Sequence, residues 1–333
     1  MSSMSLPRIL LLSAALSALA ACGSDGDGSG TGQISLGVTD SPVDVADAVV
    51  VQFTGVELKP KEGSAFSRDF AVPKTIDLLA FQGEERAMLL DGEEVPAGEY
   101  LWMRLKVNAD PDIAGDSYIT IDGADCELLI PSGDERGLQM IRGFTVGVGT
   151  ITNFTVDFDL RKSVLQPPGQ TTVVPVCDGQ AYLLKPVVRV VDNLEVGTIT
   201  GTVDSTFITE QCGTGETQSG VYPGNVYLFG PVADGDTVMP DDYDTVDADP
   251  NGADALASAM VSETDFSYTF GFVPAGNYVT AYTCDADDVL VDANDADAPA
   301  GADEVVEFTP AAGTPVTVTA SQTATVDFPP PAP

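Results

Sequence analysis

The segment that decides the fold class is TVDFDL, residues 155–160 of a chain of 333 residues. Its apolar residues alternate with two aspartates, and successive side chains of a β-strand point to opposite faces of the sheet. Val156, Phe158 and Leu160 are therefore expected to face a core, while the carboxylates of Asp157 and Asp159 face outward. The segment predicts a strand with one buried face.

The rest of the chain repeats this kind of pattern. Short runs of β-branched and aromatic residues alternate with Gly, Pro and Asp turns, and helical periodicity is almost absent, which is typical of antiparallel β-sandwiches. An all-β fold follows. The expected strands are 33–39, 48–58, 75–80, 99–107, 117–121, 126–130, 150–160, 171–177 and 181–191, and then 225–229, 256–262, 265–272, 277–284, 304–308, 314–319 and 323–328.

Two of these strands have patterns that assign side chains to faces. In the first, one face is expected to hold Leu101, Met103, Leu105 and Val107, and the other Tyr100, Trp102, Arg104 and Lys106. The second face is either covered by an opposing sheet or loop or forms an aromatic strip that binds sugars. Between residues 266 and 272 every second residue is aromatic, which predicts four rings on one face of a second core.

The chain divides near residue 192, where the segment DNLEVG (192–197) follows one strand and leads into the next, GTITGTV (197–203). The first 189 residues hold all 14 basic residues and 26 acidic ones, whereas residues 190–333 hold 25 acidic residues and no Lys or Arg. We predict two antiparallel β-sandwich domains in tandem, immunoglobulin-like or prealbumin-like, at 33–192 and 193–328. A Pro-rich tail follows at 329–333.

The net charge of −37 and the absence of histidine exclude several functions. An acidic surface has no electrostatic footprint for nucleic acid. Without His, neither a Ser-His-Asp triad nor a His-ligated zinc site can form. GxSxG, SxxK, Walker A, GxGxxG and HExxH motifs are all missing from the sequence. We therefore expect no catalysis; a carbohydrate-active enzyme would need a pair of carboxylates that the sequence does not single out.

Residues 1–21 have the features of a secretory signal, with one charge at Arg8 and an apolar run that ends in small residues. Leu19 to Cys22 resembles the lipobox of bacterial lipoproteins, which implies that Cys22 is diacylated, with palmitate as a typical chain. Gly23 at the next position favours the outer membrane of a Gram-negative bacterium. The other interpretation is an ordinary signal peptide with an incidental cysteine.

Residues 22–32 then form a tether that is rich in glycine. Ten such residues span about 17–19 Å in root-mean-square length, and two acyl chains anchor a protein stably where one does not. The folded part is expected to stand just off a membrane, held there by lipid.

Four further cysteines are Cys126, Cys177, Cys212 and Cys284. An even number of cysteines in an exported chain suggests disulfides, and four cysteines allow three pairings. The domain division favours Cys126–Cys177 and Cys212–Cys284, with one disulfide in each domain.

The first domain carries a set of short motifs. They are LGVTDSPVD (36–44), FTGVEL (53–58), IDLL (76–79), PAGEY (96–100), IPSG (130–133), GFT (143–145), DFDLRKS (157–163) and YLLKP (182–186). Together they resemble the bacterial domain-of-unknown-function family 4382, which occurs in lipoproteins. The resemblance covers residues 33–192 and implies a β-rich envelope domain without an established activity.

The second domain resembles carboxypeptidase-regulatory-like or prealbumin-like sandwich modules in GTITGTV (197–203), VYL (226–228) and residues 266–278. That resemblance implies a spacer or binding domain without catalysis. The segment VPAGEY (95–100) recurs here as VPAGNY (273–278). We interpret the repeat as the same turn-to-strand chemistry, because Pro presets the turn and Gly supplies a positive φ.

Calcium is the one cofactor that the sequence suggests, because alternating carboxylates are the hard oxygen ligands that this ion needs. Asp247, Asp249, Asn251 and Gly252 copy the first half of an EF-hand loop, but its last position falls on Ser258 instead of Glu. A second cluster is formed by Asp285, Asp287, Asp288, Asp292, Asn294, Asp295 and Asp297. The alternative is that both clusters are solvated acidic loops.

Two acidic groups of the first domain have simpler explanations. Asp40-Ser41-Pro42 is predicted to be a turn in which the aspartate caps backbone groups. Asp157, Asp159, Arg161 and Lys162 are expected to form an exposed ladder of ion pairs across strands. We expect a non-catalytic envelope lipoprotein that is structural, adhesive or binds a surface glycan or protein. The alternatives are a calcium-stabilised binding module and a carbohydrate-active enzyme.

Thermal melts distinguish bound calcium from charge screening. If either acidic cluster binds Ca²⁺, the Tm rises with Ca²⁺ at fixed ionic strength and falls again with chelator, since a ligand of the folded state stabilises it by mass action. A rise that NaCl alone reproduces in full would show screening among the acidic side chains instead.

Overall fold

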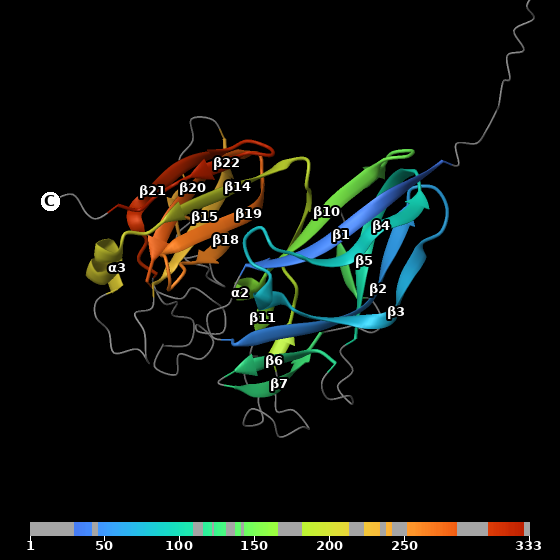
Figure 1. Ribbon diagram of the computed structural model, residues 1–333, viewed down its shortest axis with the longest axis horizontal. Helices are drawn as coiled ribbons and strands as arrows, with labels where there is room; N and C mark the ends of the chain where they lie inside the picture. Colours follow the sequence, from blue (N-terminus) through green and yellow to red (C-terminus); the bar gives the residue numbers. More distant parts are fainter. Residues whose placement is uncertain are drawn as a thin grey trace, which may run out of the picture.

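The computed structural model (Figure 1) describes residues 30–41, 46–108, 116–121, 123–130, 137–140, 143–165, 182–212, 223–233, 238–241, 252–284 and 306–329. Strands dominate these residues, so the predicted all-β, sandwich-type fold class is confirmed. The strands form two groups, 31–192 and 196–328. Within the described residues, every strand pairs with a member of its own group.

The first group is built from two sheets whose inner faces share one hydrophobic core. The smaller sheet has the order β13 (Val188–Asp192), β10 (Ile151–Asp159), β1 (Thr31–Ser41) and β4 (Ala87–Pro96). The larger has the order β11 (Val164–Leu165), β12 (Tyr182–Leu184), β7 (Ala124–Leu129), β6 (Tyr118–Ile121), β2 (Ala48–Pro60), β5 (Gly98–Asn108) and β8 (Leu138–Met140). In addition, β3 (Phe66–Asp77) pairs with β2 and β9 (Phe144–Val146) with β5.

The second group also places a core between two sheets. One has the order β19 (Ser267–Pro274), β14 (Val196–Thr202) and β22 (Thr323–Thr325), and the other β18 (Ala255–Met260), β15 (Asn225–Val232), β20 (Gly276–Thr283) and β21 (Thr309–Val318). A small pair joins β16 (Met239–Pro240) to β17 (Gly252–Ala253).

Helical structure is limited to short segments: η1 (Leu78–Ala80), α2 (Leu160–Ser163) and α3 (Ser205–Cys212). The strand pattern did not predict α3, whose buried residues Phe207 and Ile208 pack on the second core. In the described part of the chain, no helix has the length and apolarity that a membrane crossing requires.

The sheets are mixed, and the prediction of wholly antiparallel sandwiches is wrong in this respect. β1 runs parallel to β10, β7 to β12, and β14 to β22. A short turn forces two strands to be antiparallel, but each of these pairs joins strands that are far apart in the sequence. Sequence pattern alone does not reveal such pairings.

The strand that contains TVDFDL has the predicted inner face. Val156, Phe158 and Leu160 are all fully buried in the first core. The prediction for the opposite face is wrong, because Asp157 is only 8% exposed. The second group of strands covers that carboxylate, so no exposed ladder forms there.

Local shifts of register correct two of the predicted faces. Opposite Lys59 and Pro60, β5 shifts register between Trp102 and Tyr100, so Tyr100 turns into the core and Leu101 is exposed. Arg104 is ion-paired to Glu57 at 2.8 Å, and its guanidinium lies 4.9 Å from the Trp102 ring centroid. The proposed sugar-binding strip is thus shortened and occupied by its own arginine.

The second shift lies in β19, opposite Gly197 and Ile199. Tyr268 and Phe270 are buried in the second core, as predicted, and Phe266 packs against its edge. Phe272 adopts a positive φ of 53° and leaves that row, while the next residue, Val273, is fully buried in its place. One of the four expected rings is therefore free to contact the first group of strands.

Several strand predictions differ in extent. The expected strand 181–191 is interrupted and forms β12 and β13, and 75–80 ends in η1 after Asp77 caps it. β4, β8 and β9 were not predicted. The expected strand 171–177 and residues 304–305 lie outside the described residues.

Cys212 and Cys284 form the disulfide that was expected for the second group, with their Cα atoms 5.2 Å apart. It ties the end of α3 to the end of β20. Cys126 is also disulfide-bonded. Its expected partner, Cys177, lies outside the described residues, so that pairing stays a prediction.

The repeated VPAG segments build the same local structure twice. The Tyr100 hydroxyl donates a hydrogen bond to the Pro96 carbonyl at 2.7 Å, and the Tyr278 hydroxyl to the Pro274 carbonyl at 2.9 Å. In both cases the tyrosine at the strand start closes the turn that precedes it. The turn and the strand start recur as the repeat predicts, but of the two glycines only Gly98 has a positive φ, of 146°.

Removing either hydroxyl is expected to destabilise the protein by about 1 kcal/mol, because the partly buried hydrogen bond that closes the turn is lost. For Tyr100→Phe and Tyr278→Phe we expect the Tm to fall by about 2–4 °C each, measured by calorimetry. Tyr118→Phe is the control, since no hydrogen bond of its hydroxyl occurs among the described residues. Equal melting of all three variants would show that the two turns do not depend on the hydroxyls.

Candidate functional site

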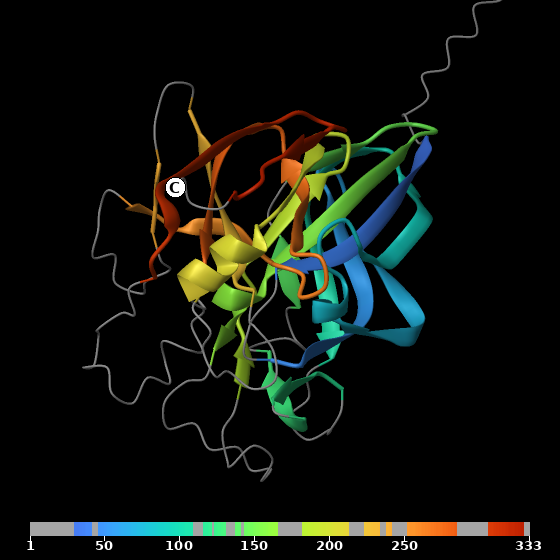
Figure 2. The same cartoon turned by 60° about the vertical axis from the view of Figure 1, so that its left-hand side comes forward.

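The second group of strands packs against the first where β1, β10 and β13 face β18 and β19 (Figure 2). Gly271 of β19 lies directly on the loop after η1: a Cβ at this position would be 1.9 Å from the Gly83 carbonyl oxygen. Beside it, the Thr198 hydroxyl donates a hydrogen bond to Glu84 at 2.7 Å. The backbone approach at Gly271 fixes the spacing between the two groups.

Basic residues of the first group reach across this junction. The Arg86 guanidinium lies 5.7 Å from the ring centroid of Phe272, the ring that left the second core. Burial raises the pKa of Tyr278, and the charge of Arg189 partly offsets that rise. Since residues 190–333 contain no Lys or Arg, every side-chain cation at this junction comes from the first group.

The turn α2 supplies two more cations. The Asp159 carboxylate accepts a hydrogen bond from the Lys162 backbone N–H at 3.3 Å and so caps the turn. Arg161 is 3% exposed; it donates to the Ser258 hydroxyl and its guanidinium lies 5.1 Å from the Tyr227 ring centroid. Lys162 Nζ donates to the Ala255 carbonyl at 2.6 Å.

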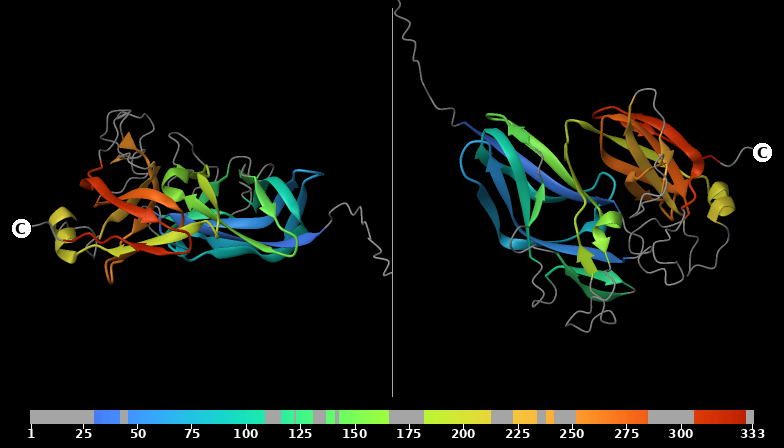
Figure 3. Two further views of the ribbon diagram at one scale, coloured as in Figure 1. Left: turned by 90° about the horizontal axis from the view of Figure 1, so that it is seen from above. Right: turned by 180° about the vertical axis from the view of Figure 1, so that it is seen from behind.

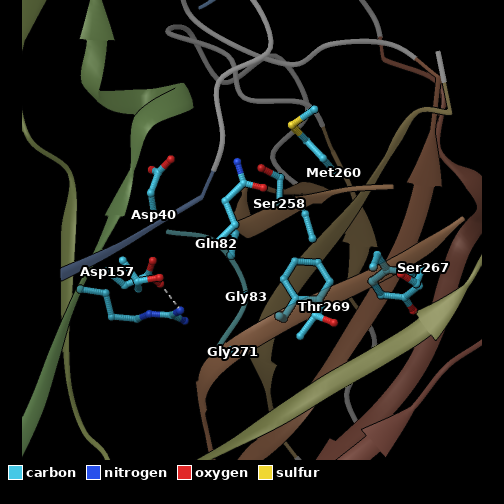
Figure 4. A pocket seen from close by; sticks show the side chains of 15 residues that line it. Asp40, Gln82, Gly83, Asp157, Ser258, Met260, Ser267, Thr269 and Gly271 are labelled. Carbon is cyan, nitrogen blue, oxygen red and sulfur yellow. Dashed lines mark hydrogen bonds and ion pairs between the residues drawn. The ribbon is translucent and has the colours of Figure 1, made fainter. Parts of the chain in front are cut away.

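A cavity of about 180 Å³ lies between the two groups (Figure 4). Asp40 and Asp157 lie on the side of the first group, and Ser258, Met260, Ser267 and Thr269 on the side of the second. Gln82 and Gly83 come from the loop after η1. The remaining lining residues are Thr39, Arg189, Ala257, Ala259, Tyr268, Phe270 and Gly271.

Asp40 is the most unusual group in this cavity. It continues the row of Ile34, Leu36 and Val38 along β1, which alternation turns toward the interior, and it is 5% exposed. Neither carboxylate oxygen has a hydrogen-bond partner among the described residues. The prediction that Asp40 starts a turn and caps backbone groups is therefore wrong, because β1 continues through Asp40 to Ser41; Pro42 lies outside the described residues.

The surroundings of Asp40 oppose its ionisation. Burial raises the pKa of the carboxyl well above its ordinary value, and the neighbouring carboxylates Asp157 and Asp159 raise it further. Arg161 and the Leu160 backbone N–H lower it to a smaller extent. A charged aspartate is thus disfavoured here unless another cation approaches it.

Asp159 has a similar but smaller shift. Burial raises its pKa to about 6, against the opposing charge of Lys162 and the hydrogen bond from the Lys162 N–H. Its carboxylate lies 3.8 Å from Lys162 Nζ. Asp159 therefore titrates close to neutral pH, at the edge of the junction.

Asp157 is paired with Arg189, its cross-strand neighbour on β13. The pair uses Arg189 Nη2 only. The Nε and Nη1 atoms of Arg189 are buried and have no hydrogen-bond partner among the described residues. Two of the residues beside the cavity, Asp40 and Arg189, thus hold buried polar atoms without hydrogen-bond partners among the described residues.

Most residues that the sequence singled out as sites lie outside the described residues. These are Cys22, Cys177, Asp247, Asp249, Asn251, Asp285, Asp287, Asp288 and Asp292. The lipidation and calcium hypotheses therefore stay predictions. Within the described ranges, no group of three His, Cys, Asp or Glu side chains is placed to hold a metal ion.

The sequence did not indicate Gln82, Gly83 or Arg189 as site residues. Arg189 carried one signal, since it is the last cation before 144 residues without any. Because Arg189 comes just before the boundary between the two groups of strands in the sequence, its charge can act on residues of both groups. Gln82 and Gly83 gave no signal, because their role depends on how β19 packs against their loop.

These features define a protein of two β-rich parts with a polar cavity where the parts meet. Residues 31–186 match the family described as "Domain of unknown function (DUF4382)". The match covers most of the first group of strands and ends before the second. No curated protein matches the chain significantly.

Similarity to solved structures is low. A leucine-rich repeat protein from Bacteroides thetaiotaomicron has 11% identity, 91% coverage of this chain and a TM-score of 0.20. The Bacillus anthracis TIE protein has 9% identity, 90% coverage and a TM-score of 0.19. This chain spans 26% and 33% of those two chains.

The major pilin subunit BcpA of Bacillus cereus has 11% identity to this chain and a TM-score of 0.17, with 90% of this chain and 99% of the pilin covered. TM-scores this low do not indicate a shared fold.

The buried carboxyls predict a specific pH dependence. A carboxyl with a raised pKa in the folded state stabilises fully below its unfolded pKa, and that contribution is lost as the pH rises through the folded pKa. For Asp159 this stabilisation is lost between about pH 4 and about pH 6. For Asp40 it is lost over a pH range that extends well above the ordinary pKa of an aspartate. The charged groups that act on these two carboxyls are Asp157, Asp159, Arg161 and Lys162.

We expect the urea midpoint of the wild type to fall between pH 5 and pH 7.5. Asp40→Asn removes an ionisation that burial disfavours, so its midpoint should fall less and exceed that of the wild type at pH 7.5. Asp91→Asn, at an exposed position of β4, controls for the general loss of one negative charge. A lower midpoint for Asp40→Asn at pH 7.5 would mean that the carboxylate is stabilised in the folded protein.

Proposed function

We propose that this protein is a non-catalytic, lipid-anchored protein of the cell envelope with a structural or adhesive role. The junction carries this proposal, because close backbone contact and buried basic residues hold the two parts as one elongated body. β1 begins at one end of the long axis, and α3 lies at the other (Figures 1 and 3). Such a body can present its far end at a distance from an anchored N-terminus.

The anchor would be Cys22, eight positions before Gly30, the first described residue. In this proposal a signal peptide is cleaved before Cys22, and lipid holds the protein at the outer membrane of a Gram-negative bacterium. The membrane is then one partner, and a surface glycan or a protein bound by the distal part is the other. The negative charge argues against nucleic acid as a partner.

The second part, in our proposal, is a carboxypeptidase-regulatory-like or prealbumin-like module. Its sheets of three and four strands around a core rich in aromatic residues support this assignment. Modules of this architecture serve as spacers or binding domains.

Calcium stabilisation is the second candidate, favoured by the charge distribution. The 25 acidic residues after Val190 have no basic residue of their own part to neutralise them. The cations at the junction can offset negative charge only on the surface of the second part that faces the first part. A divalent ion would relieve the repulsion elsewhere.

A strain that lacks the protein tests the proposed role. We expect it to attach less to surfaces or to neighbouring cells, and the wild-type gene to restore attachment. Cys22→Ser should abolish palmitate labelling, release the protein from the membrane fraction and fail to restore attachment. Gly271→Ala should restore it poorly, because the added Cβ forces the junction apart.

Gly276→Ala is the matched control for Gly271→Ala, since its Cβ would lie 3.3 Å from the nearest atom of the Tyr278 ring, whereas at Gly271 it would lie 1.9 Å from a backbone oxygen. Undiminished attachment of the deletion strain would contradict the adhesive role. Turnover of any member of a polysaccharide panel by the purified protein would instead favour a carbohydrate-active enzyme.

A further inference from the structure

Strand β1 begins between two turns at one end of the first group of strands (Figure 1). The Gly30 carbonyl accepts a hydrogen bond from the Ala97 N–H at 2.8 Å, and the Thr31 carbonyl accepts one from the Gly149 N–H at 2.8 Å. A Cβ at Gly30 would lie 2.7 Å from the Val148 side chain. We call residues 30–32, 96–98 and 147–151 the tip.

Two apolar side chains of the tip are exposed to solvent. Val148, in the turn before β10, is 70% exposed, and Ile151, the first residue of β10, is 54% exposed. Alternation along β10 places Ile151 on the face opposite to the core residues Phe154 and Val156, so the first core does not bury it. Neighbouring apolar side chains that remain exposed indicate a contact surface.

The segments that build the tip contain no charged residue, although the net charge of the chain is −37. These segments are 28–39, 95–98 and 143–156. Along β4 and β5, the first carboxylates beyond the turn 96–98 are Glu94 and Glu99, and Glu99 is ion-paired with Lys61. A membrane with anionic lipids repels an acidic surface. The tip can therefore approach such a membrane without bringing a carboxylate of its own to it.

The length of chain before β1 keeps a lipid surface close to the tip. Cys22 is eight positions before Gly30. Eight flexible residues span about 14–17 Å in root-mean-square length and about 29 Å at full extension. A membrane that holds Cys22 therefore lies within this distance of Gly30, against which Val148 packs.

We propose that the tip docks onto the lipid surface in which Cys22 is anchored, with Val148 and Ile151 inserted between the lipid headgroups. The inference rests on the lipid anchor of the proposed function and adds a second membrane contact to it. An acyl chain alone leaves the protein free to rotate on its tether, whereas a docked tip fixes its orientation. The second group of strands, at the other end of the long axis, is then held away from the membrane (Figures 1 and 3).

Fluorescence quenching by brominated lipids tests the docking. The chain from Cys22 onward, which contains every described residue, is coupled through the Cys22 thiol to a maleimide lipid in vesicles of phosphatidylethanolamine and phosphatidylglycerol. The result then does not depend on lipidation in the cell. Trp102, the one tryptophan of the chain, is replaced by Phe, and Val148→Trp supplies a single reporter. The matched control is Val72→Trp, since Val72 is 75% exposed but lies in β3, outside the tip.

We expect brominated lipids to lower the emission of the Val148→Trp variant about twofold, because apolar groups at a membrane interface are buried about 5–10 Å deep, at the boundary of headgroups and acyl chains. The emission of the Val72→Trp variant should not change. Both variants carry the same added ring, so a general affinity of tryptophan for lipid cannot produce the difference.

Reversible binding gives a second measurement that needs no added tryptophan. A single tetradecyl chain on the Cys22 thiol binds membranes only marginally, so the contribution of the tip is measurable by co-sedimentation with the same vesicles. Val148→Asp should weaken binding about tenfold, because it removes an apolar contact and brings a negative charge to an anionic surface. Val72→Asp adds the same charge outside the tip and should weaken binding much less.

The proposal is overturned if brominated lipids quench both reporters equally or if the two Asp variants bind vesicles equally well. It is also overturned if the emission of the Val148→Trp variant shifts to shorter wavelength without vesicles as the protein concentration rises, since the tip would then pack on a second copy of the chain. A failure of palmitate labelling in cells would contradict the lipid anchor instead, and it would leave these vesicle measurements unchanged.

Discussion

The contact between a part without any Lys or Arg and the basic residues of its neighbour is the interaction on which the molecule depends. Four side chains of the first part, Arg86, Arg161, Lys162 and Arg189, face the second. Two of them lie against aromatic rings and one donates to a backbone carbonyl. Among the described residues, these contacts join cations of the first part to polar and aromatic groups of the second.

This arrangement explains why the junction contains buried carboxyl groups. Cations brought to an interface must keep counter-charges nearby, and Asp157 and Asp159 supply them from the same strand and turn. Asp40 then becomes the third carboxyl in a small buried volume, where its ionisation meets both desolvation and repulsion. The raised pKa of Asp40 therefore follows from how the two parts are held together, because the carboxylates that pair with the junction cations also repel a charge on Asp40.

The sequence predicted what depends on local alternation and missed what depends on packing. Val156, Phe158 and Leu160 face the core as expected, and both VPAG segments form the same closed turn. Leu101 and Phe272 changed faces because single register shifts invert a period of two. Asp157 was expected to be exposed because nothing near it in the sequence indicates that residues 255–271 cover it.

The same reasoning explains why the candidate site was invisible in the sequence although Arg189 and Asp40 were both noticed there. A site at a junction is assembled from β1, the loop after η1, β10, β13, β18 and β19, and no motif spans segments so far apart. Gly271 and Gly83 set the spacing by backbone contact, and a cavity of about 180 Å³ remains beside that contact. A cavity lined by charged groups is then the natural result of joining the two parts through rigid backbone and buried ions.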